Sequence, residues 1–281
     1  MSNEYIVYGE NLPDAYHKAL ETLHRYGSIE QCSDWSTTQK EVAMTMVVEN
    51  PLQEPMISKL FIGGPRELEQ YRQEMLDGIL DFEIAKGNWT YTYHDRMVNY
   101  PIDKWEVIDG EEEYVQSIDQ IGFVINELKR NPSSRRAVIV IRDVYTDAYS
   151  EDPACLQYLQ YFIRDNKLHC KVLFRSNDAC KATYMNAFAL IMLQKRIADE
   201  LGYEVGTYTH RANSFHAYEQ DFGLLEGYVN RIESTWQTPS DDAMYEVAAD
   251  YEGDWIEMME EYQPEIARLV STLKGGVVVA Q

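Results

Sequence analysis

Positive charge is scarce in this sequence: 25 lysine and arginine residues stand against 47 aspartate and glutamate residues, a formal net charge of -22. A surface this acidic repels nucleic acid and anionic membranes, so we expect neither as a partner. No apolar run reaches the roughly 18 residues that a membrane-spanning helix needs. If the protein binds a phosphate, its few arginines should therefore gather in one place.

Cysteine is also sparse, and the four cysteines contain no CxxC pair that would indicate a zinc site or a redox motif. The first residues, MSNEYIVYGE, are acidic and polar, unlike a signal peptide. Free thiols in a reducing, cytoplasmic compartment are the expectation. The four positions are Cys32, Cys155, Cys170 and Cys180.

What is present is enough for a folded core, because 45% of the 281 residues are hydrophobic and 12% are aromatic. Periodicity predicts helices over residues 13–26, 66–80, 113–129, 185–202 and 221–232. Strands are predicted over 41–49, 135–143, 156–165 and 168–176, with extended segments over 88–100 and 206–218. Helices and strands are interspersed without strict alternation, which favours an α+β fold over a Rossmann fold.

The character of the chain changes after residue 232, where a polar stretch precedes an acidic one. We expect residues 1–232 to form a catalytic domain and residues 233–281 to form an acidic helical extension, with a helix over 241–273. The closing segment, GGVVVAQ, begins with two glycines that permit a hinge, so it can fold over a site.

One candidate nucleophile is Cys155, in the segment DPACLQ. A cysteine after a proline bend can lie exposed at the start of a strand. It reacts as a thiolate, and a nearby arginine lowers the pKa of such a thiol. A buried structural cysteine is the commoner outcome for an unpaired thiol, and this alternative stays open from the residue alone.

Three arginines are candidates for phosphate binding, since a guanidinium group binds phosphate oxygens in pairs. Arg135 and Arg136 are adjacent at the start of a predicted strand, and Arg175 lies in FRSND. The simpler alternative is that the adjacent pair only solvates a strand edge.

Two further pairs could recognise a small polar ring and a sugar. Asp178 and Asn186 flank the start of a predicted helix, and together their side chains can match the donors and acceptors of a pyrimidine. The alternatives are a helix cap and a satisfied core amide. His216 and Tyr218 are two residues apart, so in a strand they face one side. They suit a sugar hydroxyl, or they form a packed pair.

Five segments of the chain, in their order along it, resemble the thymidylate synthase family. Their residues are most similar to those of its short archaeal-type branch. The resembling segments are YTYHDRM (91–97), NPSSRR (131–136), PACLQYLQYFIRDNKL (153–168), FRSNDACKATYMNAF (174–188) and HAY (216–218). The resemblance implies an α+β sandwich that dimerises through a twisted sheet, and methylenetetrahydrofolate as the cosubstrate.

The resemblance also implies how a nucleoside monophosphate is attacked and held. Cys155 would add to carbon six of the pyrimidine. Arg175 and Ser176 would bind the phosphate, with Arg175 also touching the thiolate. Arg135 and Arg136 would reach across a homodimer interface to the phosphate in the partner's site.

The remaining roles concern the base, the sugar and proton transfer. Asp178 would orient the ring and contact the folate, and Asn186 would read the polar edge of the base. His216 and Tyr218 would bind the 3′-hydroxyl, and Tyr93 would lie in the proton-transfer region.

A catalytic glutamate of the family is hard to place in this chain. Both Glu69 and Glu74 are candidates on one predicted helix, and we prefer Glu74.

Several positions depart from the family pattern. Leu156 replaces a histidine after the nucleophile, and Ser214 replaces an aspartate before the sugar-binding histidine. The segment 32–41 has no arginine where the family has a phosphate ligand, so Arg25 or Lys40 is a possible substitute.

The favoured activity is methylation of dUMP to dTMP, because the neutral amide of Asn186 can match the edge of uracil. The alternative is a hydroxymethylase that acts on dUMP, dCMP or CMP with water in place of hydride. A scaffold without activity is a third hypothesis, which the intact nucleophile and arginines argue against.

Overall fold

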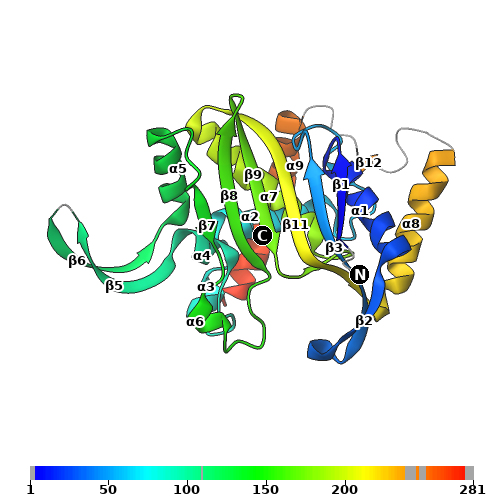
Figure 1. Cartoon of the computed structure of the whole chain (residues 1–281), viewed down its shortest axis with the longest axis horizontal. Coiled ribbons are helices and arrows are strands. Elements are labelled where there is room, and N and C mark those ends of the chain that lie inside the picture. Colours follow the sequence, from blue (N-terminus) through cyan, green and yellow to red (C-terminus); the bar gives the residue numbers. More distant parts are fainter. Residues whose placement is uncertain (1–3, 109, 238–244, 247–250, 276–281) are drawn as a thin grey trace.

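A computed structural model describes residues 4–108, 110–237, 245–246 and 251–275 (Figure 1). Its centre is a twisted mixed sheet, in which the strand order is β1 (Glu4–Gly9), β3 (Thr37–Val48), β11 (Glu204–Tyr218), β9 (Lys167–Phe174), β8 (Leu156–Arg164) and β7 (Val138–Val140). Of these neighbours, β1–β3 and β11–β9 are parallel pairs, and β3–β11, β9–β8 and β8–β7 are antiparallel pairs. Two short strands join it, β2 (Ser28–Cys32) beside β3 and β10 (Asn177–Asp178) beside β11.

Helices cover one face of this sheet. The most buried is α7 (Thr183–Leu201), which is apolar on nearly all sides and ends at Gly202 in the left-handed conformation that glycine adopts freely. Around it lie α1 (Leu12–Tyr26), α2 (Gly64–Asp77), α5 (Gln120–Arg130), α8 (Phe222–Gln237) and α9 (Tyr251–Leu273). The predicted α+β class is confirmed, and no described helix is long and apolar enough to cross a membrane.

On the other face of the sheet, side chains stay partly or fully exposed within the part of the chain that the structure describes. Alternate residues on neighbouring strands point to it, among them Tyr8, Leu173, Tyr158 and Phe162, and all of these are partly or fully exposed. Their chain neighbours on the opposite face, such as Leu159 and Phe174, are fully buried. A single chain therefore leaves a broad, mixed apolar and polar sheet face in contact with solvent.

Two predicted segments differ from the structure. Residues 113–118, predicted as helix, belong to β6 (Glu111–Ile118), which pairs with β5 (Tyr100–Ile108) in a ribbon that projects from the body (Figure 1). The helix begins at Gln120 because the Asp119 side chain caps it.

Within the predicted extended segment 88–100, residues Tyr93–Val98 form the short helix α4. The Thr92 hydroxyl caps this helix by accepting a hydrogen bond from the backbone of Asp95. The predicted strand over 135–143 is shorter, at Val138–Val140, and helix α9 begins at Tyr251 rather than at residue 241.

The C-terminal helix α9 packs beside α2, where its Ile266 side chain is buried (Figure 1). The division at residue 232 therefore stays a prediction about folding units. Residues 276–281 of the predicted hinge segment lie outside the described residues.

Candidate active site

Cys155 lies immediately before β8, at the end of the loop that follows the short helix α6 (Val144–Asp147). Its backbone carbonyl accepts a hydrogen bond from the backbone N–H of Arg175 at 2.8 Å. The thiol is half-buried, between the sealed position of a core cysteine and full exposure. The end of β9 therefore holds the candidate nucleophile at a place that a ligand can reach.

The charge state of Cys155 is set by three effects that do not all agree. Burial raises the pKa of the thiol, the guanidinium of Arg175 lowers it, and the carboxylate of Asp152 raises it further, for a net increase. The arginine acts in the expected direction, but burial outweighs it. In the free chain the thiol is therefore mostly protonated at neutral pH.

Arg175 is fixed by the same loop. Its guanidinium donates to the carbonyls of Pro153 at 2.6 Å and Ala154 at 3.1 Å, the two residues before the thiol. A guanidinium has five N–H donors, so others stay available for an anion. The arrangement couples a candidate phosphate ligand directly to the segment that carries the nucleophile.

Two tyrosines connect the nucleophile with the candidate base-reading amide. The hydroxyl of Tyr93 accepts a hydrogen bond from the Leu156 N–H at 3.3 Å. The hydroxyl of Tyr71 donates to Asn186 Oδ1 at 2.5 Å. Burial raises the pKa of both phenols, so both are neutral and can act as donors.

The structure separates the two candidate glutamates. Glu74 lines a pocket, one of its oxygens accepts from Gln70 at 2.8 Å, and burial raises the pKa of its carboxyl group. Glu69 is only 1% exposed, and its carboxylate accepts hydrogen bonds from Arg72 and Gln73. Only Glu74 therefore faces space in which a ligand can bind, in line with the preference from sequence.

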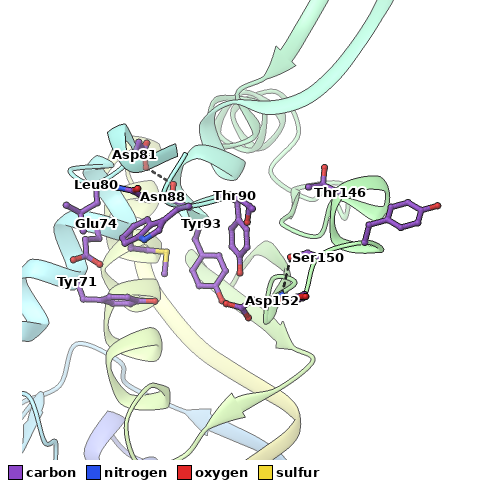
Figure 2. A pocket seen from close by; sticks show the side chains of 16 residues that line it. Tyr71, Glu74, Leu80, Asp81, Asn88, Thr90, Tyr93, Thr146, Ser150 and Asp152 are labelled. Atoms are coloured by element: carbon purple, nitrogen blue, oxygen red, sulfur yellow. Dashed lines mark hydrogen bonds between the residues drawn. The ribbon is translucent and has the colours of Figure 1, made fainter. Parts of the chain in front are cut away.

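The pocket beside Glu74 has a volume of about 850 Å³ (Figure 2). Tyr71, Glu74 and Tyr93 lie on one side of it, and Ser150 and Asp152 lie across from them. Five of its sixteen lining residues are aromatic and most of the others are polar, a mixture that suits a planar ring system with polar edges. The described lining residues are Tyr71, Glu74, Met75, Leu80, Asp81, Asn88, Trp89, Thr90, Tyr91, Thr92, Tyr93, Thr146, Tyr149, Ser150, Glu151 and Asp152.

The strand pair β10–β11 brings together the candidate sugar and phosphate residues. Asp178 is the register partner of His216, and Ser176 Oγ lies 3.4 Å from His216 Nδ1. The rings of His216 and Tyr218 meet edge to face, with centroids 4.7 Å apart. Burial lowers the pKa of His216, so the imidazole is neutral at physiological pH.

Tyr218 connects this group to the nucleophile. Burial raises its pKa to about 12, and the charges of Cys32, Asp178 and Cys155 add to the increase while Arg175 opposes it. These electrostatic contacts place Tyr218 in one neighbourhood with the candidate thiol.

Asp178 and Asn186 also make the structural contacts that were the alternatives to ligand binding, a cap and a satisfied core amide. Asp178 Oδ1 accepts from the backbone N–H groups of Cys180 and Lys181 at 2.9 and 3.0 Å, as a turn-capping carboxylate does. Asn186 is buried and bonded to Tyr71. A structural contact does not prevent a role with a ligand, because each carboxylate and amide has further hydrogen-bonding capacity.

Arg135 and Arg136 are not brought to Cys155 within the chain. Both are exposed and line a separate hollow with Glu127, Arg130 and neighbouring residues. Their position on the strand-edge side, near β7, leaves them available to a second chain.

The two suggested substitutes for the missing phosphate arginine are also engaged elsewhere. Arg25 pairs with Glu21 and Glu233, and Lys40 donates to the carbonyl of His24. Helix α1, which carries Arg25, and the start of β3, which carries Lys40, therefore do not deliver these cations to the thiol.

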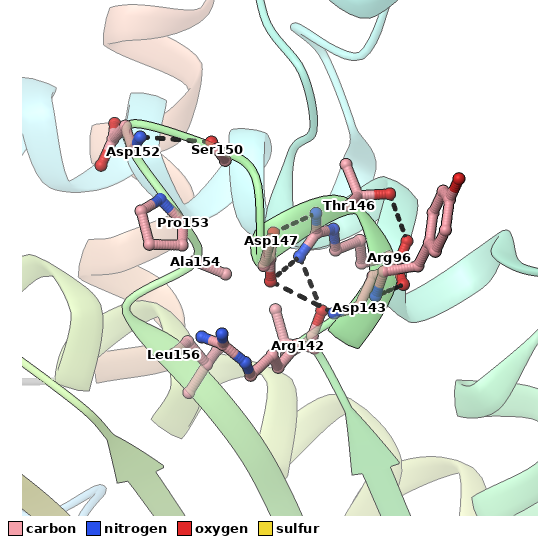
Figure 3. A network of polar contacts seen from close by, with 12 residues as sticks. Arg96, Arg142, Asp143, Thr146, Asp147, Ser150, Asp152, Pro153, Ala154 and Leu156 are labelled. Atoms are coloured by element: carbon pink, nitrogen blue, oxygen red, sulfur yellow. Dashed lines mark hydrogen bonds and ion pairs between the residues drawn. The ribbon is translucent and has the colours of Figure 1, made fainter.

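A buried ion pair that sequence reasoning missed holds the loop before the nucleophile (Figure 3). Arg96 donates twice to Asp147, at 2.7 Å each, and once to the carbonyl of Ile141 at 3.0 Å. Removing one partner of such a pair leaves an uncompensated buried charge. The only sequence signal was an arginine inside YTYHDRM, and nothing indicated that its partner would be Asp147.

Comparisons with known proteins identify the family and the fold. A family model described as thymidylate synthase matches residues 66–266. A Methanocaldococcus jannaschii protein named "Putative thymidylate synthase" is 30% identical over 226 residues, which are 78% of this chain and 93% of that protein. A thymidylate synthase of Bacillus atrophaeus is 30% identical over 140 residues, 48% of this chain and 61% of that protein.

The fold has a solved counterpart in thermostable thymidylate synthase A from Bacillus subtilis, with a TM-score of 0.59 at 19% identity. The match covers 79% of this chain and 84% of that one. Sequence and fold together define a methyltransferase-type enzyme of nucleotide biosynthesis. The chain belongs to the thymidylate synthase family, whose members act on pyrimidine nucleotides with methylenetetrahydrofolate.

Proposed function

We propose that the protein transfers a one-carbon unit to carbon five of dUMP and releases dTMP. The observation that carries the proposal is a linked set of contacts around the half-buried Cys155 thiol. Arg175 bonds to the loop that carries the thiol, and Tyr71, whose pKa is raised by burial and also by Cys155, donates to the Asn186 amide. The amide side chain offers both a donor and an acceptor, which matches the adjacent carbonyl and N–H of uracil.

The nucleotide is held by residues from several strands. Arg175 and Ser176 bind its phosphate, and His216 and Tyr218 bind the 3′-hydroxyl of its sugar. Asp178 and Asn186 orient the base, with the Asn186 amide fixed by its bond to Tyr71. These contacts hold the nucleotide beside the thiol, so that the addition takes place within one complex instead of between two freely diffusing molecules.

The reaction begins when the Cys155 thiolate adds to carbon six of the ring, which makes carbon five nucleophilic. Hydrogen bonds from Asn186 stabilise the charge that develops on the ring oxygen. Arg175 offsets part of the burial that disfavours the thiolate. Carbon five would then bond to the transferred one-carbon unit and lose its proton. After hydride reduces that unit to a methyl group, the Cys155 sulfur would leave with its bonding electrons as the ring double bond re-forms.

The aromatic pocket fits methylenetetrahydrofolate, which supplies the one-carbon unit and, in a synthase, the hydride when it is bound. Tyr71, Tyr91 and Trp89 provide flat apolar wall for its ring system. Burial raises the pKa of Glu74, which suits a carboxyl group that holds and passes on a proton more readily than an exposed carboxylate does. Tyr93 stays neutral at the boundary between this pocket and the nucleophile.

The proposal is tested by incubating the protein with methylenetetrahydrofolate and dUMP, dCMP or CMP in turn. We expect dihydrofolate to form with dUMP, seen as an increase in its absorbance, together with dTMP. A hydroxymethyl product without dihydrofolate would instead establish the hydroxymethylase. No product and no tritium release from carbon five of any labelled pyrimidine would contradict both enzymes.

We also propose that the protein works as a cytoplasmic homodimer that buries the exposed sheet face. This face carries the partly or fully exposed side chains of Tyr8, Tyr158, Phe162 and Leu173, and exposed apolar side chains on one sheet face suit contact with a partner. In that arrangement Arg135 and Arg136 of one chain reach the phosphate in the partner's site.

The dimer proposal predicts that each site draws on two chains. A Cys155→Ala variant and an Arg135→Ala/Arg136→Ala variant are each expected to be nearly inactive alone. After mixing and exchange of subunits, up to about a quarter of the sites combine an intact thiol with intact partner arginines, so activity returns. Sedimentation measures the assembly, and activity that stays absent in confirmed mixed dimers would contradict the shared site.

A further inference from the structure

A carboxylate that no family motif led us to consider lies beside the candidate sugar site. Glu41 on β3 is the register partner of His216 on β11, and Gln39 is the partner of Tyr218. The pairing shifts between Ala212 and Phe215, where β11 is irregular. Ser214 lies in this irregular stretch, next to the Glu41 side chain.

The contacts of Glu41 form a short chain toward the histidine. One oxygen, Oε2, accepts from Ser214 Oγ at 2.5 Å and from Gln39 Nε2 at 2.5 Å. Ser214 Oγ in turn lies 3.3 Å from His216 Nδ1. A serine hydroxyl has one proton, and that of Ser214 is donated in the hydrogen bond to the Glu41 carboxylate. The Ser214 oxygen can therefore only accept from the imidazole.

This arrangement decides which imidazole nitrogen carries the proton. His216 Nδ1 also lies 3.3 Å from the backbone carbonyl of Ser214, which can only accept a hydrogen bond. Both oxygens of Ser214 thus favour a proton on Nδ1, and the third neighbour of this nitrogen, Ser176 Oγ at 3.4 Å, also has a lone pair that can accept that proton. The neutral ring then has its lone pair on Nε2.

The nitrogen left as an acceptor has nothing to accept from in the described residues. His216 is only 3% exposed, and its Nε2 is buried without a hydrogen-bond partner. An unsatisfied buried acceptor is costly, so the folded chain is prepared for a donor that arrives with a ligand. A hydroxyl group is a donor of suitable size.

We propose that Glu41 is a positioning residue for sugar recognition. Through Ser214 it holds the His216 ring so that Nε2 accepts a hydrogen bond from a sugar hydroxyl. The inference rests on the proposed nucleotide substrate and adds a residue and a direction of hydrogen bonding to that site. Glu41 does not contact the reacting carbon, so its effect should depend on the hydroxyl alone.

The test compares two nucleotides that differ only in that hydroxyl, dUMP and 2′,3′-dideoxyuridine monophosphate. Calorimetry measures the Kd of each for the wild-type chain and for Glu41→Gln. We expect the substitution to weaken dUMP binding about tenfold and to leave binding of the dideoxy nucleotide nearly unchanged. A general disturbance of the strand pair would weaken both ligands equally, and that result would overturn the inference.

Two further variants make the comparison specific. Glu30→Gln removes the same charge from an exposed position on the adjacent strand β2, and it should leave both affinities unchanged. Glu41→Gln/Ser214→Asp moves a carboxylate one contact closer to His216 and should restore preference for the hydroxyl. If the double variant folds with wild-type thermal stability but shows no preference, the inference fails.

The outcome also separates this inference from the proposed function. If the wild-type chain binds neither nucleotide, the proposed substrate is wrong. If it binds both with equal affinity, the hydroxyl contact of His216 and Tyr218 is wrong together with the role of Glu41. If Glu41→Gln weakens both ligands equally, only the role of Glu41 is wrong.

Discussion

The two halves of the candidate site are built in different ways. The nucleotide half consists of residues at strand ends, including Cys155, Arg175 and His216, whose backbones belong to or adjoin the β-sheet ladder. The half that forms the aromatic pocket comes from helices and loops, including Glu74 on α2 and Tyr93 on α4.

This difference explains what each half can do. Strand register fixes the nucleotide residues relative to one another, as a preorganised site requires. Loops and short helices instead depend on side-chain contacts, such as the Arg96–Asp147 pair that holds the loop before Cys155 (Figure 3). Substitutions in the two halves should therefore distinguish residues that are needed for turnover from residues that stabilise the fold of the site.

The largest effect is expected at the nucleophile. Cys155→Ala should reduce turnover by about 10⁴-fold or more, because no other group can add to carbon six. Tritium release from carbon five of labelled dUMP measures it.

Cys170→Ala is the matched control, since that thiol lies in the core on β9. It should lower stability by roughly 1 kcal/mol and keep turnover. Equal turnover in the Cys155 variant and the wild type would remove the nucleophile from the mechanism.

A second comparison uses the two glutamates of α2. Glu74→Gln should lower kcat roughly 10²-fold while the melting temperature hardly changes, because Glu74 faces the pocket. Glu69→Gln should remove the nearly buried one of the two carboxylates that pair with Arg72, the other being Asp77, and destabilise the fold by about 3 kcal/mol. Steady-state kinetics and thermal unfolding of both variants measure the contrast, and the reverse pattern would reassign the catalytic carboxyl group.

The difference between regular elements and loops also explains which features could be predicted from the sequence alone. The β8–β9 hairpin was predictable, because Asp165 and Asn166 tolerate the positive φ values of 51° and 59° that they adopt. Helix α7 was predictable from its length and apolar content. Side chains on such regular elements keep the spacing that a motif records.

Other features depended on contacts between distant segments. Residues 113–118 joined a strand because β5 was available as a partner, which helical periodicity does not reveal. The net increase in the Cys155 pKa was missed because burial depends on the packed loop. Glu41 was missed because its meeting with Ser214 follows from the β3–β11 register. The roles of the individual site residues stay predictions until variants are measured.

The smallest expected effect concerns the charge next to the nucleophile. Asp152 raises the pKa of Cys155, so Asp152→Asn should lower that pKa. Only the thiolate reacts with iodoacetamide, and at about pH 8 it is the minor form when the pKa lies above its ordinary value. The variant should therefore be alkylated roughly twofold to fivefold faster at that pH, and the midpoint of its pH–rate profile should lie lower. Glu151→Gln is the control, because that exposed neighbour lines the same pocket without contributing to the thiol's pKa. Equal acceleration in both variants would mean that general access to the pocket, rather than the Asp152 charge, governs the reactivity of Cys155.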